Sequence, residues 1–100
     1  MNRCNSRGLP DILIIAGHLT VQQDDRDLYV ADCAAAVLAA RNADGCLDFA
    51  VSADAVDPAR VNVFERWQTR ESLNAFRGDG PHDDLRRRIL DSTIAEYDVA

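Results

Sequence analysis

The stretch VNVFERWQTRESLNAF, residues 61–76, places a carboxylate close to the chain's single tryptophan. Glu65 and Trp67 lie two positions apart, so in a strand both side chains point to the same face of the sheet. Val61 and Val63 share that face, which predicts that it is buried. Because an unpaired carboxylate is costly to bury, two interpretations are open. Glu65 either forms a salt bridge with one of the arginines or contacts a ligand in a pocket that Trp67 lines.

The two histidines are the other candidates for acid–base chemistry, because imidazole titrates near neutral pH. His18 lies inside an apolar stretch, and His82 follows a Gly-Pro pair where a helix is predicted to begin. Either side chain could deprotonate a bound ligand or donate a hydrogen bond to it. For His82, a plain surface position at the start of a helix is the alternative.

The composition excludes several classes of function. The formal net charge is -6, and all eleven basic residues are arginines. An acidic surface repels phosphate backbones, so we expect no nucleic-acid partner. No apolar run approaches the roughly 18 residues of a membrane span, so we expect no membrane association. Cys4, Cys33 and Cys46 have no metal-site spacing, which predicts free thiols in the cytoplasm and no bound metal.

The length of 100 residues and the hydrophobic fraction of 47% predict one globular domain. Residues 1–10 (MNRCNSRGLP) predict a loose polar leader rather than a signal peptide. The domain is expected to cover residues 11–100. A core of this size is modest, and many folds of this length bury more surface by pairing with a second copy.

Strand and helix patterns alternate along the domain. Strands are predicted over residues 11–21, 46–54, 60–68 and 92–100. Helices are predicted over residues 28–42, 69–76 and 81–90, with a break at 77–81. The first strand begins apolar on both faces, which is typical of a strand that is central or faces a partner. Gly17 and His18 are expected to interrupt it.

Residues near the ends of these elements refine the prediction. Asp24 or Asp25 is expected to cap the first helix, and Thr69 the second. In the second strand, Cys46 is expected to point away from the face that carries the larger apolar side chains. That face is formed by Leu47, Phe49, Val51 and Ala53.

The basic run Arg86-Arg87-Arg88 follows two aspartates and predicts a solvated helix face. Asp83 would pair with Arg87, and Asp84 with Arg88, because these positions are one helical turn apart.

The order β-α-β-β-α-β, with the second helical region in two pieces, predicts an α+β fold of the ferredoxin-like type. Its four strands form one antiparallel sheet with helices on one face. The sequence also resembles the antibiotic biosynthesis monooxygenase (ABM) family of dimeric α+β barrels, over about residues 12–99. Three stretches carry this resemblance in order, namely DGCLDFAVSAD (44–54), VFERWQTRESLNAF (63–76) and GPH (80–82).

The resemblance implies a homodimer, in which two sheets pack through the faces that helices leave uncovered, with Asn62, Phe64 and Arg66 on that side. It also implies a pocket between sheet and helices in each subunit. Characterised ABM enzymes oxidise reduced aromatic compounds such as quinols and anthrones with O2, without flavin or metal. The chain is thus expected to be a cofactor-free monooxygenase whose partners are a small aromatic molecule and O2. A non-catalytic binding protein of the same fold is the alternative.

The resemblance further implies a set of site residues. His82 matches a family histidine near the pocket mouth, and His18 lies where heme-degrading relatives place a pocket asparagine, so both are catalytic candidates. Trp67 matches the family tryptophan, either as a pocket wall or as a core residue. The expected substrate contacts are Phe49, Val63, Glu65, Trp67, Phe76 and Arg87.

Several departures from the family pattern weaken the catalytic reading. Phe76 stands where the family often has a histidine, and Val63 where quinone-forming members can carry an asparagine. Asn62 is one residue away and is predicted to face the other side of the sheet. Arg86 stands at the position of the heme-ligating histidine of heme-degrading relatives, so no heme is expected. These departures favour the binding-protein alternative.

Overall fold

The computed structural model describes residues 12–79 and 83–99, and it leaves the side chains of residues 79 and 83 undescribed. The predicted leader and His82 therefore lie outside the described residues. The elements in chain order are β1 (Ile12–Val21), the 3-10 helix η2 (Gln23–Asp25), α1 (Arg26–Asp32), α2 (Ala34–Arg41), β2 (Cys46–Ala53), β3 (Arg60–Trp67), α3 (Arg70–Asp79), α4 (Asp83–Arg87) and β4 (Ile89–Val99).

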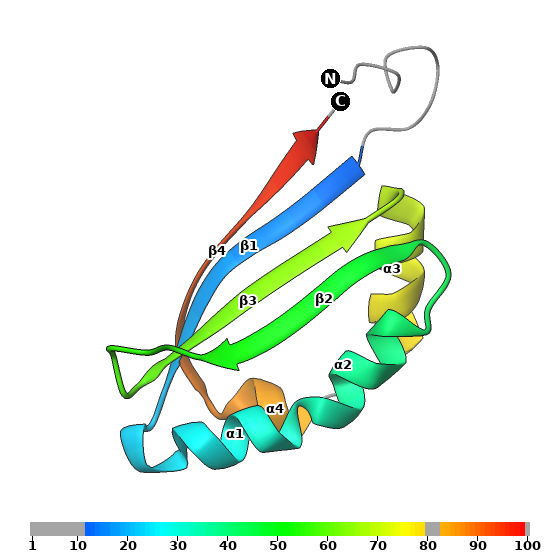
Figure 1. Ribbon diagram of the computed structural model, residues 1–100. Helices are drawn as coiled ribbons and strands as arrows, with labels where there is room; N and C mark the ends of the chain where they lie inside the picture. The colour runs from blue at the N-terminus through cyan, green and yellow to red at the C-terminus, as the bar shows by residue number, and fades with distance from the viewer. Residues whose placement is uncertain (1–11, 80–82, 100) are drawn as a thin grey trace.

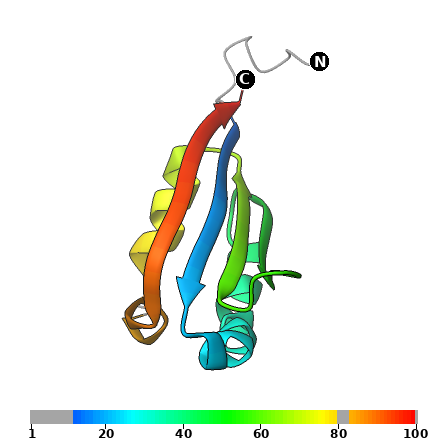
Figure 2. The same cartoon turned by 90° about the vertical axis from the view of Figure 1, so that its left-hand side faces the viewer.

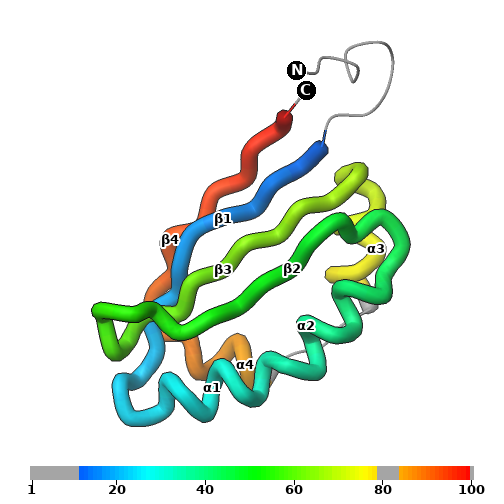
Figure 3. Tube along the Cα trace, viewed as in Figure 1, coloured from blue at the N-terminus to red at the C-terminus, as the bar shows by residue number. Residues whose placement is uncertain are grey.

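The four strands form one antiparallel sheet in the order β2-β3-β1-β4. Figure 1 shows the helices gathered on one side of this sheet. Figure 2, turned by 90°, shows β4 along the near edge with α3 beside it. The tube in Figure 3 shows β1 and β3 between the two edge strands. The predicted α+β, ferredoxin-like fold is therefore confirmed.

The central strand β1 separates a covered face from an open face of the sheet. Leu13, Ile15, Leu19 and Val21 are buried under the helices, at alternate positions of the strand. The side chains between them are half-buried and belong to the open face, on which no helix of the described residues lies. The apolar start of β1 thus reflects a helix layer on one side and an uncovered surface on the other.

Two hydrophobic clusters fill the space between the sheet and the helices. The first gathers the buried side chains of Leu13, Ile15, Ala40, Phe49, Trp67 and Leu73. The second gathers those of Leu19, Val21, Tyr29, Cys33 and Val61. Each cluster takes residues from both layers, so burying them fixes the helices on the sheet. Among the described residues, no helix is both long enough and apolar enough to cross a membrane.

Gly17 does not interrupt β1, contrary to the expectation, because the strand runs through it and pairs on both sides. Its φ of 153° is in a region that side chains rarely adopt. A Cβ atom at this position would lie 2.0 Å from the carbonyl oxygen of Thr93 on β4. The glycine therefore lets β1 and β4 approach closely.

Two predictions about strand ends were wrong. A register shift between Cys46 and Asp48 turns Cys46 toward the first cluster, while Leu47 becomes exposed. Such an irregularity inserts one residue and swaps the faces before it. The last helix ends at Arg87, and Ile89 already pairs with Val21 in β4. Its apolar side chain packs in the second cluster from the strand and not from a helix.

The helix ends agree in part with the expected caps. The Thr69 hydroxyl accepts a hydrogen bond from the backbone N–H of Ser72 at 3.0 Å, as expected of a cap at the start of α3. Asp25 precedes α1, but its side chain makes no capping bond. The first helical region is two helices that meet at Cys33. The second helical region begins with α3, which continues through Gly78, where a break was expected.

Arg88 links the end of the helical region to α1. It donates hydrogen bonds to Asp25, Asp32 and Asp84, at 2.9 to 3.1 Å. Its guanidinium also lies over the ring of Tyr29, 5.2 Å from the centroid. The predicted Asp84–Arg88 pair is thus confirmed, but the side chain is only 19% exposed and not solvated. The predicted Asp83–Arg87 pair involves a side chain outside the described set.

We predict that Gly17→Ala lowers the free energy of unfolding by about 2–4 kcal/mol, because the new Cβ collides with backbone that cannot rotate away. Urea unfolding followed by circular dichroism measures the change. Gly78→Ala is the matched control, since a Cβ there meets nothing within 4 Å. The free energy of unfolding of that variant should be unchanged or should rise by up to about 1 kcal/mol. Equal effects of the two substitutions would contradict the account of Gly17.

Candidate functional site

Three aromatic rings meet on the covered face, each from a different element. Phe49 comes from β2, Trp67 from the end of β3, and Phe76 from α3. The centroid of Phe76 lies 5.5 Å from that of Trp67 and 6.0 Å from that of Phe49, and Phe49 and Trp67 are 6.5 Å apart. These separations are typical of stabilising aromatic contacts. Three of the residues expected to contact a substrate are thus brought together.

Glu65 lies beside this aromatic group and is held by it. The indole N–H of Trp67 donates a hydrogen bond to Oε1 of Glu65, at 2.9 Å. Burial raises the pKa of the Glu65 carboxyl above its ordinary value of 4.5, while the Trp67 hydrogen bond and the charge of Arg77 act in the opposite direction. Of the two interpretations of Glu65, a direct salt bridge is not found among the described residues. The carboxyl is instead a partly desolvated group with one oxygen fixed by tryptophan.

A charged group borders the site where α3 meets β4. Arg70 donates to Glu96 at 3.0 Å, and Nη1 of Arg77 lies 3.6 Å from the other oxygen of Glu96. These contacts lower the pKa of the Glu96 carboxyl, with the hydrogen bond from Arg70 as the largest cause. Arg77 acts on both Glu65 and Glu96, so it connects the aromatic site to this border.

Burial sorts the site residues into those a ligand would meet and those behind them. Trp67 is 0% exposed and Phe49 is 8% exposed, so both belong to the core. Glu65 and Phe76 are half-buried and therefore partly accessible. Val63 packs against the second hydrophobic cluster rather than against the aromatic rings. A ligand would therefore contact Phe76 and Glu65 first, with Trp67 as the support of the carboxyl.

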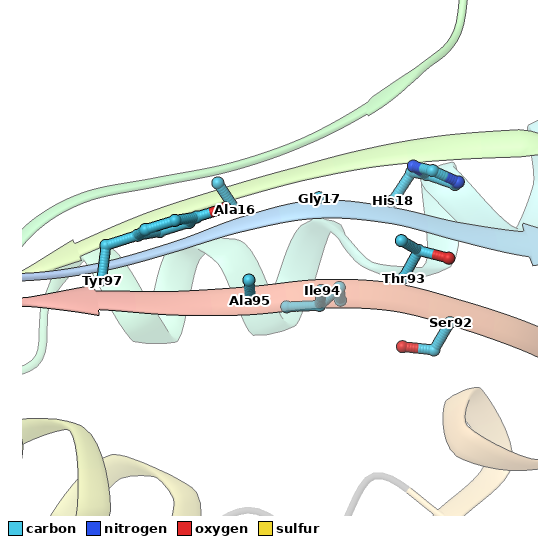
Figure 4. Close-up of a pocket in the computed structure, with 8 residues that line it drawn as sticks. All are labelled: Ala16, Gly17, His18, Ser92, Thr93, Ile94, Ala95 and Tyr97. Atoms are coloured by element: carbon cyan, nitrogen blue, oxygen red, sulfur yellow. The ribbon is translucent and has the colours of Figure 1, made fainter.

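His18 is not brought together with these residues. It pairs with Asn62 on β3 and with Thr93 on β4, which places it on the open face. Trp67 pairs with Leu13 and points to the covered face. Figure 4 shows the His18 ring projecting to the same side of the strands as Tyr97. Within one copy of the chain, His18 and the aromatic site are separated by the sheet.

The remaining expected residues fall elsewhere. His82 lies outside the described residues, and Arg87 is an exposed residue at the end of α4. Asn62 lies on the open face, as expected. Its amide oxygen accepts a hydrogen bond from Arg60 at 2.7 Å, and its amide nitrogen donates one to Asp54 at 2.9 Å. In the part of the chain that the structure describes, no group of three or more His, Cys, Asp or Glu side chains could hold a metal ion.

The charged group of Arg70, Arg77 and Glu96 was not predicted from the sequence, although the sequence contains a signal for part of it. Arg70 and Arg77 are seven residues apart, so two helical turns bring them to the same face of α3. Glu96 occupies a covered-face position of β4, because it pairs with Ile15. Its pairing with the two arginines follows from the packing of α3 against the sheet, which the sequence pattern alone does not specify.

The raised pKa of Glu65 predicts a pH dependence of stability with a definite sign. Between the ordinary value of 4.5 and the higher folded value, the folded chain binds more protons than the unfolded chain. The free energy of unfolding of the unchanged protein, relative to that of Glu65→Gln, should therefore fall as the pH rises through this range. It should stay low at higher pH. Urea unfolding of both proteins from about pH 3 to about pH 8 measures the difference.

Glu96→Gln is the control, because the pKa of Glu96 is shifted the other way. Its contribution to stability should be present above the unfolded pKa and be lost as the pH falls through the lower folded value. The two variants should thus give slopes of opposite sign. Slopes of the same sign would contradict the assigned environments.

The comparisons with known proteins agree on the family and the fold. The family model described as antibiotic biosynthesis monooxygenase matches residues 12–88. The Rv0793 protein from Mycobacterium tuberculosis is 25% identical, with a TM-score of 0.66, covering 89% of this chain and 92% of that one. A provisionally named antibiotic biosynthesis monooxygenase from Chloroflexus aurantiacus is 23% identical, with a TM-score of 0.71, covering 89% and 93%.

A conserved protein of unknown function from Bacteroides thetaiotaomicron, described as a possible oxidoreductase, has a TM-score of 0.78 at 12% identity. It covers 89% of this chain and 98% of its own, and at this identity it shows the fold alone. No protein with a curated description gives a significant match. Because the family model spans well over half of the sequence and the sheet topology agrees with it, the chain belongs to the antibiotic biosynthesis monooxygenase family.

Proposed function

We propose that the protein is a cofactor-free monooxygenase that oxidises a small aromatic quinol or anthrone-like substrate with O2. One observation supports this most directly, namely a desolvated carboxyl, Glu65, fixed by Trp67 beside three aromatic rings in a fold of this family. The rings suit a flat apolar substrate. The carboxyl offers a proton acceptor whose pKa is raised toward the working pH.

The proposed reaction balances without an external electron donor. Removal of a proton gives an electron-rich anion, which transfers electrons to O2 and forms a peroxide at a ring carbon. Loss of water from that carbon leaves a carbonyl group. One oxygen atom enters the substrate, and the other leaves as water with two hydrogens that the substrate supplied. The substrate itself reduces O2, so the proposal assigns no flavin, heme or metal to the protein.

Among the described residues, Glu65 is the proton acceptor that we propose. The indole of Trp67 donates a hydrogen bond to Oε1, which orients the carboxyl. The second carboxyl oxygen is left for the substrate. Phe76 is the accessible ring of the aromatic group. The positive charge of Arg77 would stabilise the substrate anion. His82 stays a candidate base only through the family resemblance, since it lies outside the described residues, whereas His18 could act only on a ligand at the open face.

We also propose that two copies pair through their open faces in a dimeric α+β barrel. Apolar side chains on this face are contributed by all four strands, namely Ile12, Ile14, Ala16, Ala50, Phe64, Ala95, Tyr97 and Val99. An apolar surface of this extent is typical of an interaction site. Burying it between two identical sheets would complete a core that one copy leaves open on this side.

A binding protein without chemistry is the second candidate function. It is favoured by Phe76 and Val63, which stand where members of the family can carry a histidine and an asparagine, so fewer polar groups are left for chemistry. A quinol that raises the melting temperature without O2 uptake would support this alternative.

We predict that Phe64→Asp weakens dimer formation by roughly 100-fold or more, because a charge would be buried in the proposed interface. Sedimentation equilibrium over a range of protein concentrations measures this. Val56→Asp is the matched control, since Val56 is 89% exposed in the turn between β2 and β3 and should leave the association unchanged. A wild-type chain that sediments as a monomer would rule out the proposed dimer.

We predict O2 consumption by the purified protein with some members of a panel of reduced quinols and anthrones, above their autoxidation. Glu65→Gln should lower kcat by about 100-fold, the typical contribution of a positioned base, and Phe76→Ala should raise KM. Val56→Asp again serves as the control. Full activity in Glu65→Gln together with loss in His82→Ala would move the base to His82, and loss in His18→Ala would move the chemistry to the open face.

A further inference from the structure

Two carboxylates lie in one row across the covered face of the sheet, with an apolar residue between them. Ile15 on β1 pairs with Glu65 on β3 and with Glu96 on β4, so all three side chains point to the helices. Because neighbouring strands are about 4.8 Å apart, the backbones of the two glutamates are separated by roughly 10 Å. A long basic side chain that comes from the helices above Ile15 could therefore pair with either glutamate.

Arg77 is such a side chain, and it is paired with only one of the two carboxylates. It belongs to α3, which lies beside β4 in Figure 2. Its Nη1 is 3.6 Å from Oε2 of Glu96, whereas none of the ion pairs of the described residues joins it to Glu65. Its charge nevertheless acts on Glu65, because it opposes the burial that raises the pKa of that carboxyl. Arg77 therefore lies near both carboxylates and binds the one on β4.

Glu96 is itself held in place from its other side. Arg70 donates a hydrogen bond to Oε1 of Glu96 at 3.0 Å, which leaves Oε2 for Arg77. The two arginines are seven residues apart, so both lie on the same face of α3. Both oxygens of Glu96 are thus engaged by one helix. This arrangement places the guanidinium of Arg77 on the β4 side of the aromatic site.

The other groups that face Glu65 offer no second cation in the part of the chain that the structure describes. From β3, the indole of Trp67 donates a hydrogen bond to its carboxyl. From β2 comes Cys46, where burial, and then the charge of Glu65, raise the pKa of the thiol. The basic side chain of α2 bonds instead to the backbone of β2. Arg77 is therefore the cation for which Glu65 and Glu96 compete.

We propose that Glu96 is a positioning residue of this site, which holds Arg77 on the side of β4 and thereby keeps Glu65 unpaired. An arginine in direct contact with Glu65 would favour its charged form and make it a weaker base. Held by Glu96, Arg77 keeps its charge near the site without neutralising the base. The consequence for catalysis rests on the proposed oxygenase function, whereas the position of Arg77 does not.

The test is an NMR titration of the Glu65 carboxyl carbon in the full chain, with Glu65→Gln used to assign the signal. In Glu96→Gln the pKa of Glu65 should fall, because Arg77 becomes free to pair with it. In Arg77→Gln the pKa of Glu65 should rise, because the cation that opposes the effect of burial is lost. Glu71→Gln is the matched control. It removes the same charge from an exposed position of α3 and should leave the pKa of Glu65 unchanged.

A double variant separates this positioning role from the direct effect of the Glu96 charge. That charge by itself raises the pKa of Glu65, so its removal lowers the pKa even without any movement of Arg77. The direct part persists when Arg77 is absent, whereas the part that acts through Arg77 does not. Glu96→Gln should therefore lower the pKa of Glu65 less in the Arg77→Gln background than in the unchanged protein.

The same substitution has an expected effect on the proposed reaction. In Glu96→Gln, the acidic limb of the pH profile of kcat should move to lower pH, because the base loses its proton more easily. The value of kcat at higher pH should fall, because a weaker base removes a proton more slowly. A merely structural role of Glu96 would lower the yield of folded protein and leave the pH profile in place.

Two results would overturn the proposal. The first is an unchanged pKa of Glu65 in Glu96→Gln, which would show that Arg77 does not turn to Glu65. The second is an equal effect of Glu96→Gln in the two backgrounds, which would show that Glu96 acts through its charge alone. In each variant, the indole N–H signal of Trp67 reports whether the site is still folded.

These readings come from the carboxyl signal and need no substrate, so they are separate from the test of the proposed function. If the pKa of Glu65 changes as expected but no quinol or anthrone supports O2 uptake, the positioning role of Glu96 is upheld and the oxygenase function fails. If O2 uptake is found but the pKa of Glu65 does not respond to Glu96→Gln, the function is upheld and the positioning role fails.

Discussion

The pairing of β1 with β3 determines which residues of the sheet can lie together. Each side chain of the two strands must point either to the helices or to the open face. Leu13 pairs with Trp67 and Ile15 with Glu65, so these four residues meet the helices. The residues at the alternate positions of β1, among them Ala16 and His18, point to the opposite surface. A slip of one position would exchange the two sets. The separation of Glu65 and Trp67 from His18 is therefore the product of a single register.

Within the covered face, the hydrogen bond from Trp67 to Glu65 reconciles a carboxyl with a hydrophobic core. The indole N–H needs an acceptor when it is buried, and the carboxyl needs a donor. Each satisfies the other, at 2.9 Å. Burial nevertheless raises the pKa of Glu65, so the hydrogen bond offsets the loss of water only in part. The result is a carboxyl that is fixed in position and easily protonated, which suits proton transfer from a weakly acidic substrate.

The order of elements, the antiparallel sheet and the shared face of Glu65 and Trp67 could be predicted from the sequence, because they depend on local periodicity. The separation of His18 from Trp67 follows from the pairing of β1 with β3, which local patterns do not give. The inward turn of Cys46 depends on a register irregularity without a clear sequence signal. Arg88 was misjudged for a related reason, since two of its partners, Asp25 and Asp32, are distant in sequence.

The account rests on Glu65 being a desolvated carboxyl held by the indole of Trp67. The most direct test is a pH titration of the Glu65 carboxyl carbon by NMR, with the indole N–H of Trp67 followed in the same samples. We predict a pKa above the ordinary value of 4.5, with the indole signal moving at the same midpoint. A pKa at or below 4.5, or an indole signal that does not move during the titration, would contradict this environment of Glu65.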